Sequence, residues 1–318
     1  MRRRCCDDAN VRLLRLCPGG RAKLDGLFVF KSSVLLKDAI TSAINRLTAA
    51  SVGSPRMNAE LLLMFTLGRD RAFLFAHPER ELTAKEQSRY EEALDQRARG
   101  IPAQYITGHQ EFWGMDFIVT PAVLIPRPET EHVIETLLKL NDDGRTSAAS
   151  SLPRIVDVGT GSGCIALALG KELAHAEIHA TDISSPALEV ARANAARHQL
   201  ESRIHFHQTD LLQGFDRDVF DFVASNPPYV GESEEDQVQL EVRKFEPRNA
   251  VFAGPTGVEV IERLIPQAHA ALKPGGWLVI EISGTIADRV KLLLGGWNQV
   301  QISNDLQGIP RVASAQKP

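Results

Sequence analysis

Cysteines, long apolar runs and basic tracts are all scarce in this sequence, and each absence excludes a class of protein. The four cysteines form no Cys-x-x-Cys pair and have no histidines at matched spacing, so neither a zinc site nor a disulfide framework is predicted. No apolar run approaches the roughly 20 residues that a membrane-spanning helix needs. A signal peptide is not expected, because Asp7 and Asp8 follow the basic residues 1–4 at once and no long apolar segment comes next. We therefore expect a reduced, cytoplasmic protein with no membrane partner.

The charge balance also argues against a large nucleic-acid interface. The 318 residues include 36 Lys and Arg against 40 Asp and Glu, for a net charge of −4, and no basic tract occurs beyond the first four residues. Tight binding of DNA or RNA usually needs a basic patch or stripe. We expect no stable nucleic-acid partner, and we expect a monomer.

The first third of the chain is predicted to be helical after an irregular start. Residues 1–32 show little pattern and are interpreted as a loose extension or a start-site artefact. Residues 33–108 carry apolar side chains at helical spacing, and Ser54-Pro55 indicates the beginning of one helix. Thr83 with Glu86 is typical of a capping box that opens a further helix. These residues predict a small helical-bundle domain.

Residues 109–127 are predicted to form a β-hairpin linker. The run Phe112–Val119 is rich in aromatic and β-branched residues, and Ala122–Ile125 is a second short apolar run. After this linker a helix is expected over Glu131–Leu140, followed by a polar loop over Asn141–Ser151.

Residues 128–318 are predicted to form an α/β domain. Short apolar strands alternate with helices from Arg154 onward, which indicates a mostly parallel sheet with helices on both faces. The strands are expected at Ile155–Val158, Glu177–Thr181, Ile204–Gln208, Phe220–Ser225 and Trp277–Ile282; the helices between them are expected at Cys164–Leu173, Pro186–Gln199 and Val258–Leu272, the last ended by Lys273–Gly276. Two antiparallel strands between Trp297 and Ala315 would complete a seven-stranded, Rossmann-like sheet.

A glycine-rich loop, Asp157–Gly163, lies between the first of these strands and a helix. Glycines allow the backbone to approach a ligand closely, and the N-terminus of the helix offers free N–H groups. Asp182 ends the next strand, where a carboxylate can accept hydrogen bonds from both hydroxyls of a ribose. Asp210 ends the third strand and could bind the exocyclic amine of an adenine. The candidate cofactor-binding residues are Gly159, Thr160, Gly161, Ser162, Gly163, Asp182, Asp210, Leu211 and Asn226.

This pattern alone fits a dinucleotide, S-adenosylmethionine, or a tight turn with no ligand. It does not fit a P-loop, because no Gly-Lys-Ser/Thr follows the glycines.

Asn226-Pro227-Pro228-Tyr229 is the most specific motif of the chain. Two successive prolines fix the backbone and remove two N–H donors, so only acceptors remain. The Asn226 side-chain oxygen and the Pro227 carbonyl can then accept both hydrogens of an –NH2 group, while Tyr229 covers its flat face. The predicted catalytic residues are Asn226, Pro227 and Tyr229, and the predicted substrate-binding residues add Pro228. An ordinary Pro-Pro turn is the alternative.

The position of Asn226–Tyr229 in the sheet decides between a dinucleotide and S-adenosylmethionine, which the glycine loop alone leaves open. The motif lies at the carboxyl end of the fourth strand, the side of such sheets where ligands bind. A hydride-transfer enzyme has no need of an amine-binding corner there, whereas a methyl donor does. S-Adenosylmethionine, leaving as S-adenosylhomocysteine, is therefore the expected cofactor.

Several further residues invite a functional role. His205 and His207 share one face of a strand, but no third ligand is evident, so no metal site is expected and surface polar residues are the preferred interpretation. Glu129 and Glu131 either favour a helix dipole or line the site. The acidic run Glu232–Asp236 is either a solvated loop or a lid over the substrate.

Together these motifs resemble the release factor glutamine N5-methyltransferases. The resemblance rests on Pro126–Glu131, Asp157–Gly163, Asn226–Tyr229, Glu246-Pro247 and Asp305–Arg311, and covers about Leu35 to Gln316. It implies methylation of the glutamine in the Gly-Gly-Gln loop of bacterial-type peptide chain release factors, docked in part by the helical domain. One departure is Glu281-Ile282-Ser283-Gly284, where the family often has Glu-Ile-Gly.

The implied reaction is a direct in-line displacement that needs no metal and no covalent intermediate. Two other classes of function stay open at this stage. An amino-methyltransferase acting on adenine could use the same corner, although the acidic charge balance opposes it. A non-catalytic cofactor-binding or adaptor protein would have no need of the intact motif.

Overall fold

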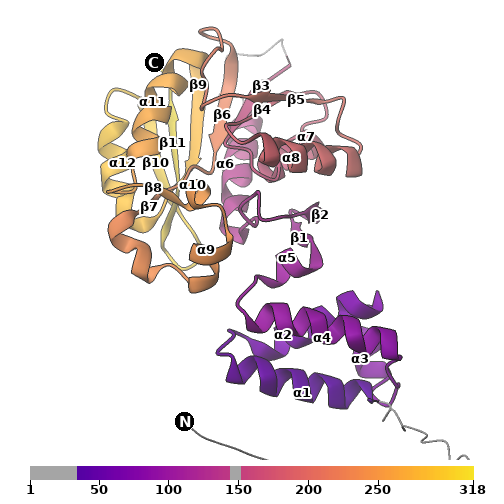
Figure 1. The fold of residues 1–318 in the computed structure, drawn as a ribbon. Coiled ribbons are helices and arrows are strands. Elements are labelled where there is room, and N and C mark those ends of the chain that lie inside the picture. Colours follow the sequence, from indigo (N-terminus) through magenta and orange to yellow (C-terminus); the bar gives the residue numbers. More distant parts are fainter. Residues whose placement is uncertain (1–33, 144–151) are drawn as a thin grey trace, which may run out of the picture. The chain divides into compact units, whose positions relative to one another are not determined.

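A computed structural model of the chain describes residues 34–143 and 152–318 (Figure 1). The expected loose extension over residues 1–32 lies outside these ranges, as does most of the expected loop Asn141–Ser151. Within the described ranges no helix combines the length and the apolar character needed to cross a lipid bilayer.

The helices near the N-terminus have a hydrophobic core of their own. They are α1 (Leu36–Ala49), α2 (Pro55–Leu67), α3 (Arg71–Ala76), α4 (Ala84–Ala98) and α5 (Ala103–Thr107). The expected helix start at Pro55 is confirmed. The capping box is confirmed too: Thr83 Oγ1 accepts a hydrogen bond from the Glu86 N–H at 3.2 Å, and the Glu86 carboxylate accepts one from the Thr83 N–H at 2.8 Å. The core includes fully buried Leu47, Leu62 and Tyr90.

A β-hairpin follows, but it does not use the strands predicted from the apolar runs. β1 (His109–Phe112) pairs antiparallel with β2 (Met115–Ile118), and the turn between them places Trp113 at φ 53° and Gly114 at φ 63°. The prediction that Ala122–Ile125 forms a strand is wrong. Its backbone is bonded by side chains instead: Val123 O accepts from the Tyr105 hydroxyl at 2.6 Å, and Ile125 N–H donates to Glu246 at 3.1 Å.

The remaining chain forms the predicted seven-stranded sheet. Its strands are β3 (Arg154–Val158), β4 (Glu177–Asp182), β5 (Ile204–Gln208), β6 (Phe220–Ser225), β9 (Leu272–Glu281), β10 (Asn298–Asn304) and β11 (Pro310–Gln316). Their order is β10-β11-β9-β6-β3-β4-β5, and only β11 runs antiparallel to the other strands, pairing in this way with β10 and β9. The chain leaves β3 first towards β4 and later returns on the other side at β6. The edge between β3 and β6 is therefore the switch point of the sheet, where the chain changes direction. Ligands bind at such a point, beyond the carboxyl ends of the strands.

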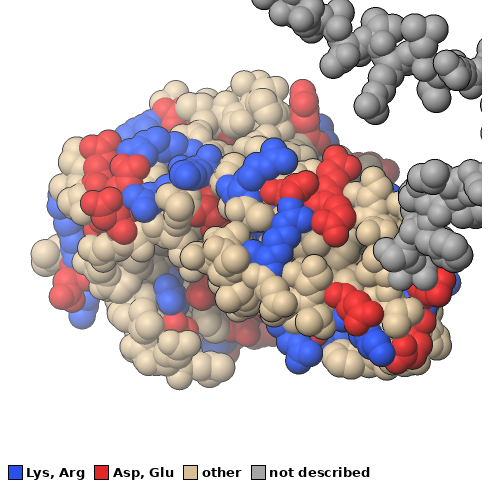
Figure 2. Space-filling view, turned by 60° about the horizontal axis from the view of Figure 1, so that its bottom comes forward, with Lys and Arg blue, Asp and Glu red and all other residues tan. Residues whose placement is uncertain are grey.

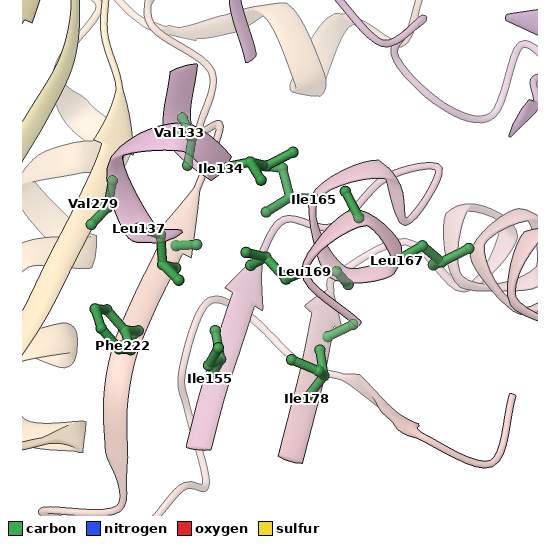
Figure 3. Packing of buried hydrophobic residues seen from close by; sticks show 14 of the residues in the cluster. Val133, Ile134, Leu137, Ile155, Ile165, Leu167, Leu169, Ile178, Phe222 and Val279 are labelled. Carbon is green, nitrogen blue, oxygen red and sulfur yellow. The ribbon is translucent and has the colours of Figure 1, made fainter. Parts of the chain in front are cut away.

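Helices cover both faces of this sheet. The helices of this part are α6 (Glu131–Asp142), α7 (Cys164–Glu172), α8 (Ser185–Arg197), α9 (Leu240–Phe245), α10 (Arg248–Val251), α11 (Glu259–Ala271) and α12 (Ala287–Leu293). Because side chains alternate along a strand, Ile155 packs with α6 and α7 while Val156 packs with α11 and α12. Figure 3 shows the first of these layers, where Leu137 and Leu169 lie over Ile155 and Phe222.

Several short elements were not predicted, and the predicted start of one strand, β9 at Trp277, is wrong. The small sheet of β7 (Val230–Gly231) and β8 (Phe252–Gly254), and the 3-10 helices at Pro128–Thr130, Glu232–Gln237 and Gly284–Ile286, are too short for periodicity to reveal. Lys273–Gly276 does not form a separate turn after α11 but belongs to β9. Gly275 N–H donates to Lys317 O at 3.0 Å and Lys317 N–H donates to Gly276 O at 2.8 Å, which extends the sheet over these residues.

Asn194 ties the hairpin to the glycine loop and should be important for stability. Its fully buried side chain accepts from Ile118 N–H at 2.7 Å and donates to Ile118 O at 3.0 Å and Ser162 O at 2.9 Å. Asn194→Ala leaves these groups unpaired, so we expect the free energy of unfolding to fall by about 3 kcal/mol. Chemical denaturation measures the change, and Glu189→Ala on the exposed face of the same helix is the control. Equal unfolding midpoints for both variants would contradict this role.

Candidate active site

The glycine loop holds a backbone shape that favours glycine at every second residue. Gly159, Gly161 and Gly163 have φ values of 72°, 55° and 85°. A Cβ atom at Gly163 would also lie 2.7 Å from Leu167 Cδ1, so a larger residue would require the Leu167 side chain to move. The N–H groups of Gly159 and Thr160 donate to Thr181 O at 2.9 and 2.8 Å. The loop is thereby fixed to the end of β4.

Asp182, at the end of β4, faces this loop as predicted. One carboxylate oxygen accepts from Gly161 N–H at 2.9 Å and the other accepts from Ser184 N–H at 2.8 Å. Burial raises the pKa of Asp182, while these N–H groups oppose the rise. A carboxylate has about four lone-pair sites, so each oxygen can still accept a further hydrogen bond from a ligand.

A cavity of about 700 Å³ opens above the loop. Among its lining residues are most of the predicted site residues, namely Gly159, Thr160, Gly161, Ser162, Asp182, Asp210, Leu211, Asn226 and Pro228. Gly163, Pro227 and Tyr229 do not line it. Its size is that of a small-molecule or cofactor site.

Two features of this cavity were not predicted. Asp210 is already paired, because its carboxylate accepts a hydrogen bond from Arg263, which also lines the cavity. Ile183 lines the cavity too and keeps 60% of its surface exposed. The only signal for Ile183 in the sequence is its place directly after Asp182. The loop, the acid and an exposed apolar side chain for a flat ring fit S-adenosylmethionine.

The Asn226–Tyr229 corner separates this cavity from a smaller one. Asn226 and Pro228 line both the large cavity and a second cavity of about 140 Å³. Tyr229 and Arg127 line only the smaller one. Two ligands that occupied the two cavities would therefore meet at Asn226.

Side chains from distant segments surround the corner in a chain of hydrogen bonds. Asn226 Nδ2 donates to Thr130 Oγ1 at 2.9 Å, and Thr130 Oγ1 donates to Glu281 at 2.6 Å. The Tyr229 hydroxyl donates to the other oxygen of Glu281 at 2.9 Å. Within Pro126–Glu131 it is thus Thr130 that contacts the corner, whereas Glu131 accepts a hydrogen bond from Trp113 N–H at 2.9 Å. Glu281 was missed as a site residue, although it opens the segment Glu281-Ile282-Ser283-Gly284 and ends a neighbouring strand.

Glu246 anchors the segment that carries Thr130. Its side chain is almost fully buried, and it accepts from Arg127 at 2.5 Å and from Ile125 N–H at 3.1 Å. An isolated buried carboxylate is costly, so the Arg127 guanidinium compensates for its burial. This pair links Glu246-Pro247 to Pro126–Glu131 in the folded chain.

Neither the histidines nor the acidic run lines these two cavities. His207 Nε2 is 2.9 Å from Nδ1 of His179, a neighbour on β4 that was not considered, and burial lowers the pKa of both imidazoles. No group of three or more possible metal ligands occurs within residues 34–143 and 152–318. The run Glu232–Asp236 forms a 3-10 helix, in which Glu235 pairs with Arg248 at 2.8 Å.

Asp157, at the end of β3, should make stability depend on pH. It is fully buried, and this burial raises the pKa of its carboxyl to about 7 from 3.8. Between these values the folded state binds more protons than the unfolded state, so its stability falls as the pH rises. Asp157→Asn keeps the shape but cannot titrate. Relative to this variant, we expect the wild type to lose stability, on the order of a few kcal/mol, between pH 4 and pH 8. Parallel stability–pH curves for the two proteins would contradict this.

The fold and the site together define a class of enzyme. A mostly parallel seven-stranded sheet, a glycine loop with a facing acid, and an Asn-Pro-Pro-Tyr corner at the switch point are those of a class I methyltransferase that uses S-adenosylmethionine. Residues 143–244 match the family "Methyltransferase small domain", and residues 38–108 match "PrmC N-terminal domain".

Curated relatives specify the family. The chain is 53% identical over 284 residues to the release factor glutamine methyltransferase of Koribacter versatilis, which covers 89% of this chain and 99% of that protein. It is 43% identical to the protein of the same name from Chlorobaculum tepidum, over 82% of this chain and 90% of that one. The chain belongs to the release factor glutamine methyltransferase family.

Among solved structures, the catalytic domain of hMettl16 in complex with an RNA hairpin is similar in fold. It is 19% identical, with a TM-score of 0.50 over 70% of this chain and 81% of that one. This likeness concerns the fold alone.

Proposed function

We propose that this protein transfers a methyl group from S-adenosylmethionine to the side-chain amide nitrogen, N5, of the glutamine in the Gly-Gly-Gln loop of bacterial-type peptide chain release factors. The observation that carries the proposal is the position of Asn226 between two cavities, one large enough for the cofactor and one of about 140 Å³ for a side chain. Membership of the family supplies the substrate.

The large cavity would hold the cofactor. When bound, S-adenosylmethionine supplies an electrophilic methyl group on a sulfonium centre and leaves as S-adenosylhomocysteine. The loop Gly159–Gly163 would contact the cofactor through its backbone, and Asp182 would accept hydrogen bonds from the ribose hydroxyls. Asp210 and Leu211 would lie at the adenine, where Ile183 offers an apolar face.

The corner would hold the substrate amide. An amide nitrogen is a weak nucleophile because its lone pair is delocalised into the carbonyl. By accepting both N–H groups, Asn226 Oδ1 and the Pro227 carbonyl would fix the direction of that lone pair and increase electron density at nitrogen. Pro228 would keep this backbone rigid, and the Tyr229 ring would cover the flat face of the amide. The surplus proton would leave to water or to a carbonyl.

The helical region, residues 34–108, would help to dock the release factor. Its surface exposes large apolar side chains that its own core does not need: Met57 is 62% exposed and Phe75 is 63% exposed. An arginine lies beside one of these side chains: Arg71 Cζ is 5.6 Å from the centroid of the Phe75 ring. Aromatic rings and arginines are enriched at protein interfaces. The substrate would thus be recognised at a second place as well as at its glutamine.

An adenine amino-methyltransferase would need a basic groove for its nucleic acid. On the face shown in Figure 2, lysines and arginines are interspersed with acidic side chains and do not form a continuous basic stripe.

A substrate from the translation machinery would place the reaction in the cytoplasm. The residues proposed for the site all come from one chain, so a monomer would suffice.

Transfer of labelled methyl groups tests the proposal. The purified full chain is incubated with labelled S-adenosylmethionine and a recombinant release factor, its Gln→Ala loop variant, RNA or DNA. Label is expected only in the unaltered release factor. Label in nucleic acid, or equal label in the Gln→Ala variant, would overturn the assignment.

A further inference from the structure

Two residues outside the motif contact it from segments far apart in the sequence. Thr130 lies in the 3-10 helix before α6, and Glu281 is the last residue of β9. Because β6 and β9 are paired in parallel with Ser225 opposite Ile280, Asn226 and Glu281 follow side by side at the carboxyl ends of these strands. Thr130 then bridges them, with 2.9 Å to Asn226 Nδ2 and 2.6 Å to Glu281.

The chemistry of these groups gives the hydrogen bonds one direction. When Glu281 is ionised, its carboxylate only accepts, so Thr130 donates its single hydroxyl hydrogen to Glu281. The Thr130 oxygen can then only accept from Asn226, which requires that the Asn226 –NH2 points to Thr130. The Asn226 carbonyl oxygen is thereby directed away from Thr130. The Tyr229 hydroxyl donates to the second oxygen of Glu281 at 2.9 Å, so both oxygens of the carboxylate act as acceptors.

We propose that Thr130 and Glu281 are positioning residues that fix the orientation of the Asn226 amide, so that its oxygen and not its –NH2 group faces the substrate. The inference rests on the proposed function, in which Asn226 must accept a hydrogen bond from the glutamine amide. A flipped Asn226 would present two donors to a substrate –NH2 group, which also donates. Without the positioning pair, both orientations of the amide would be populated and only one would be productive.

Burial supports a specific use of these two residues. Thr130 and Glu281 are each 1% exposed, so bulk water cannot readily replace either of them as a partner. Burial raises the pKa of Glu281 and the nearby Glu129 adds to the rise, whereas the hydroxyls of Thr130 and Tyr229 and the guanidinium of Arg311 oppose it. A buried carboxylate is a weak source of stability, and an apolar residue of similar volume is often better. Control of the Asn226 amide gives this carboxylate a function.

Substitutions of Thr130 in the full chain test the proposal. Thr130→Val keeps the shape but removes the hydroxyl, and we expect kcat for release-factor methylation to fall about tenfold. The dissociation constant of S-adenosylhomocysteine, measured by calorimetry, should not change. Thr130→Ser restores the hydroxyl and should restore most of the rate. As a matched control, Thr66→Val removes another buried hydroxyl, one that bonds only within α2, and should leave kcat unchanged.

A double-mutant cycle distinguishes positioning from packing. If Thr130 acts through Asn226, then Thr130→Val should have no further effect on the residual single-turnover rate of Asn226→Ala. Glu281→Gln offers only one acceptor to the two hydroxyls, so its kcat should fall about as far as that of Thr130→Val. Additive losses in the cycle, or a Thr130→Ser variant no faster than Thr130→Val, would overturn the proposal. Its failure is separate from that of the proposed function, since the wild-type chain would then still methylate the release factor.

Discussion

Asn226→Ala is expected to lower kcat for release-factor methylation by at least about 10²–10³-fold, while cofactor affinity stays close to that of the wild type. Removal of one preorganised hydrogen-bonding group in an active site typically has an effect of this size. Asn226 accepts from the substrate amide in the proposed mechanism, and in the alanine variant only the Pro227 carbonyl of that pair of acceptors would remain, because prolines supply no side-chain acceptor. The loss should therefore appear in the rate and not in binding of the cofactor.

Single-turnover methyl transfer and calorimetric titration with S-adenosylhomocysteine measure the two quantities separately. Asn298→Ala, on an exposed position of β10, is the control and should be neutral in both. If Asn226→Ala weakened cofactor binding as much as it slowed turnover, then Asn226 would serve the cofactor, and the assignment of the substrate amide to this corner would fall.

The contrast between Asn226 and its partners shows what the sequence can predict. The corner and the glycine loop are local patterns, in which neighbouring residues alone dictate the backbone, and both lie where they were expected. Thr130 and Glu281 are 151 residues apart in the sequence, and Glu281 lies beside Asn226 because β6 pairs with β9. No local pattern contains that pairing. A resemblance marked the segment of Thr130 as important, but only the geometry shows which of its side chains contacts Asn226.

The hairpin shows a different limit. Only β2 lies within the apolar run Phe112–Val119; β1 ends at the first residue of the run, and the turn lies at Trp113-Gly114, inside it. A tryptophan at positive φ is uncommon, and here the Trp113 N–H donates to Glu131 at 2.9 Å while its indole donates to Glu172 at 2.9 Å. Both partners come from other helices, so tertiary contacts hold a turn that residue preference does not favour.

Asp182→Ala is expected to weaken binding of S-adenosylmethionine by about 10²–10⁴-fold. Hydrogen bonds to a charged group contribute about 1.5–3 kcal/mol each, and a ribose would lose two of them. The same carboxylate accepts from the N–H groups of Gly161 and Ser184, so the free protein should also lose some stability. Asp182→Asn keeps the shape and one acceptor oxygen, and it should lie between the wild type and the alanine variant.

The effect of Asp182→Ala should be compared with that of the same substitution at Asp210, the second acid of the cavity. Asp210 is paired with Arg263 before any ligand arrives, so its carboxylate must be shared, and we expect Asp210→Ala to weaken binding only about tenfold. Titration calorimetry on both variants, with denaturation curves of the ligand-free proteins, separates lost contacts from lost folding. Equal effects of Asp182→Ala and Asp210→Ala would mean that the charge of the cavity, and not a specific contact with Asp182, determines affinity. A much larger loss of affinity for Asp182→Ala than for Asp210→Ala, at similar stability, would support a specific contact between Asp182 and the ribose hydroxyls. Asp182 faces the glycine loop, and no cation pairs with it among the hydrogen bonds and ion pairs found in residues 34–143 and 152–318.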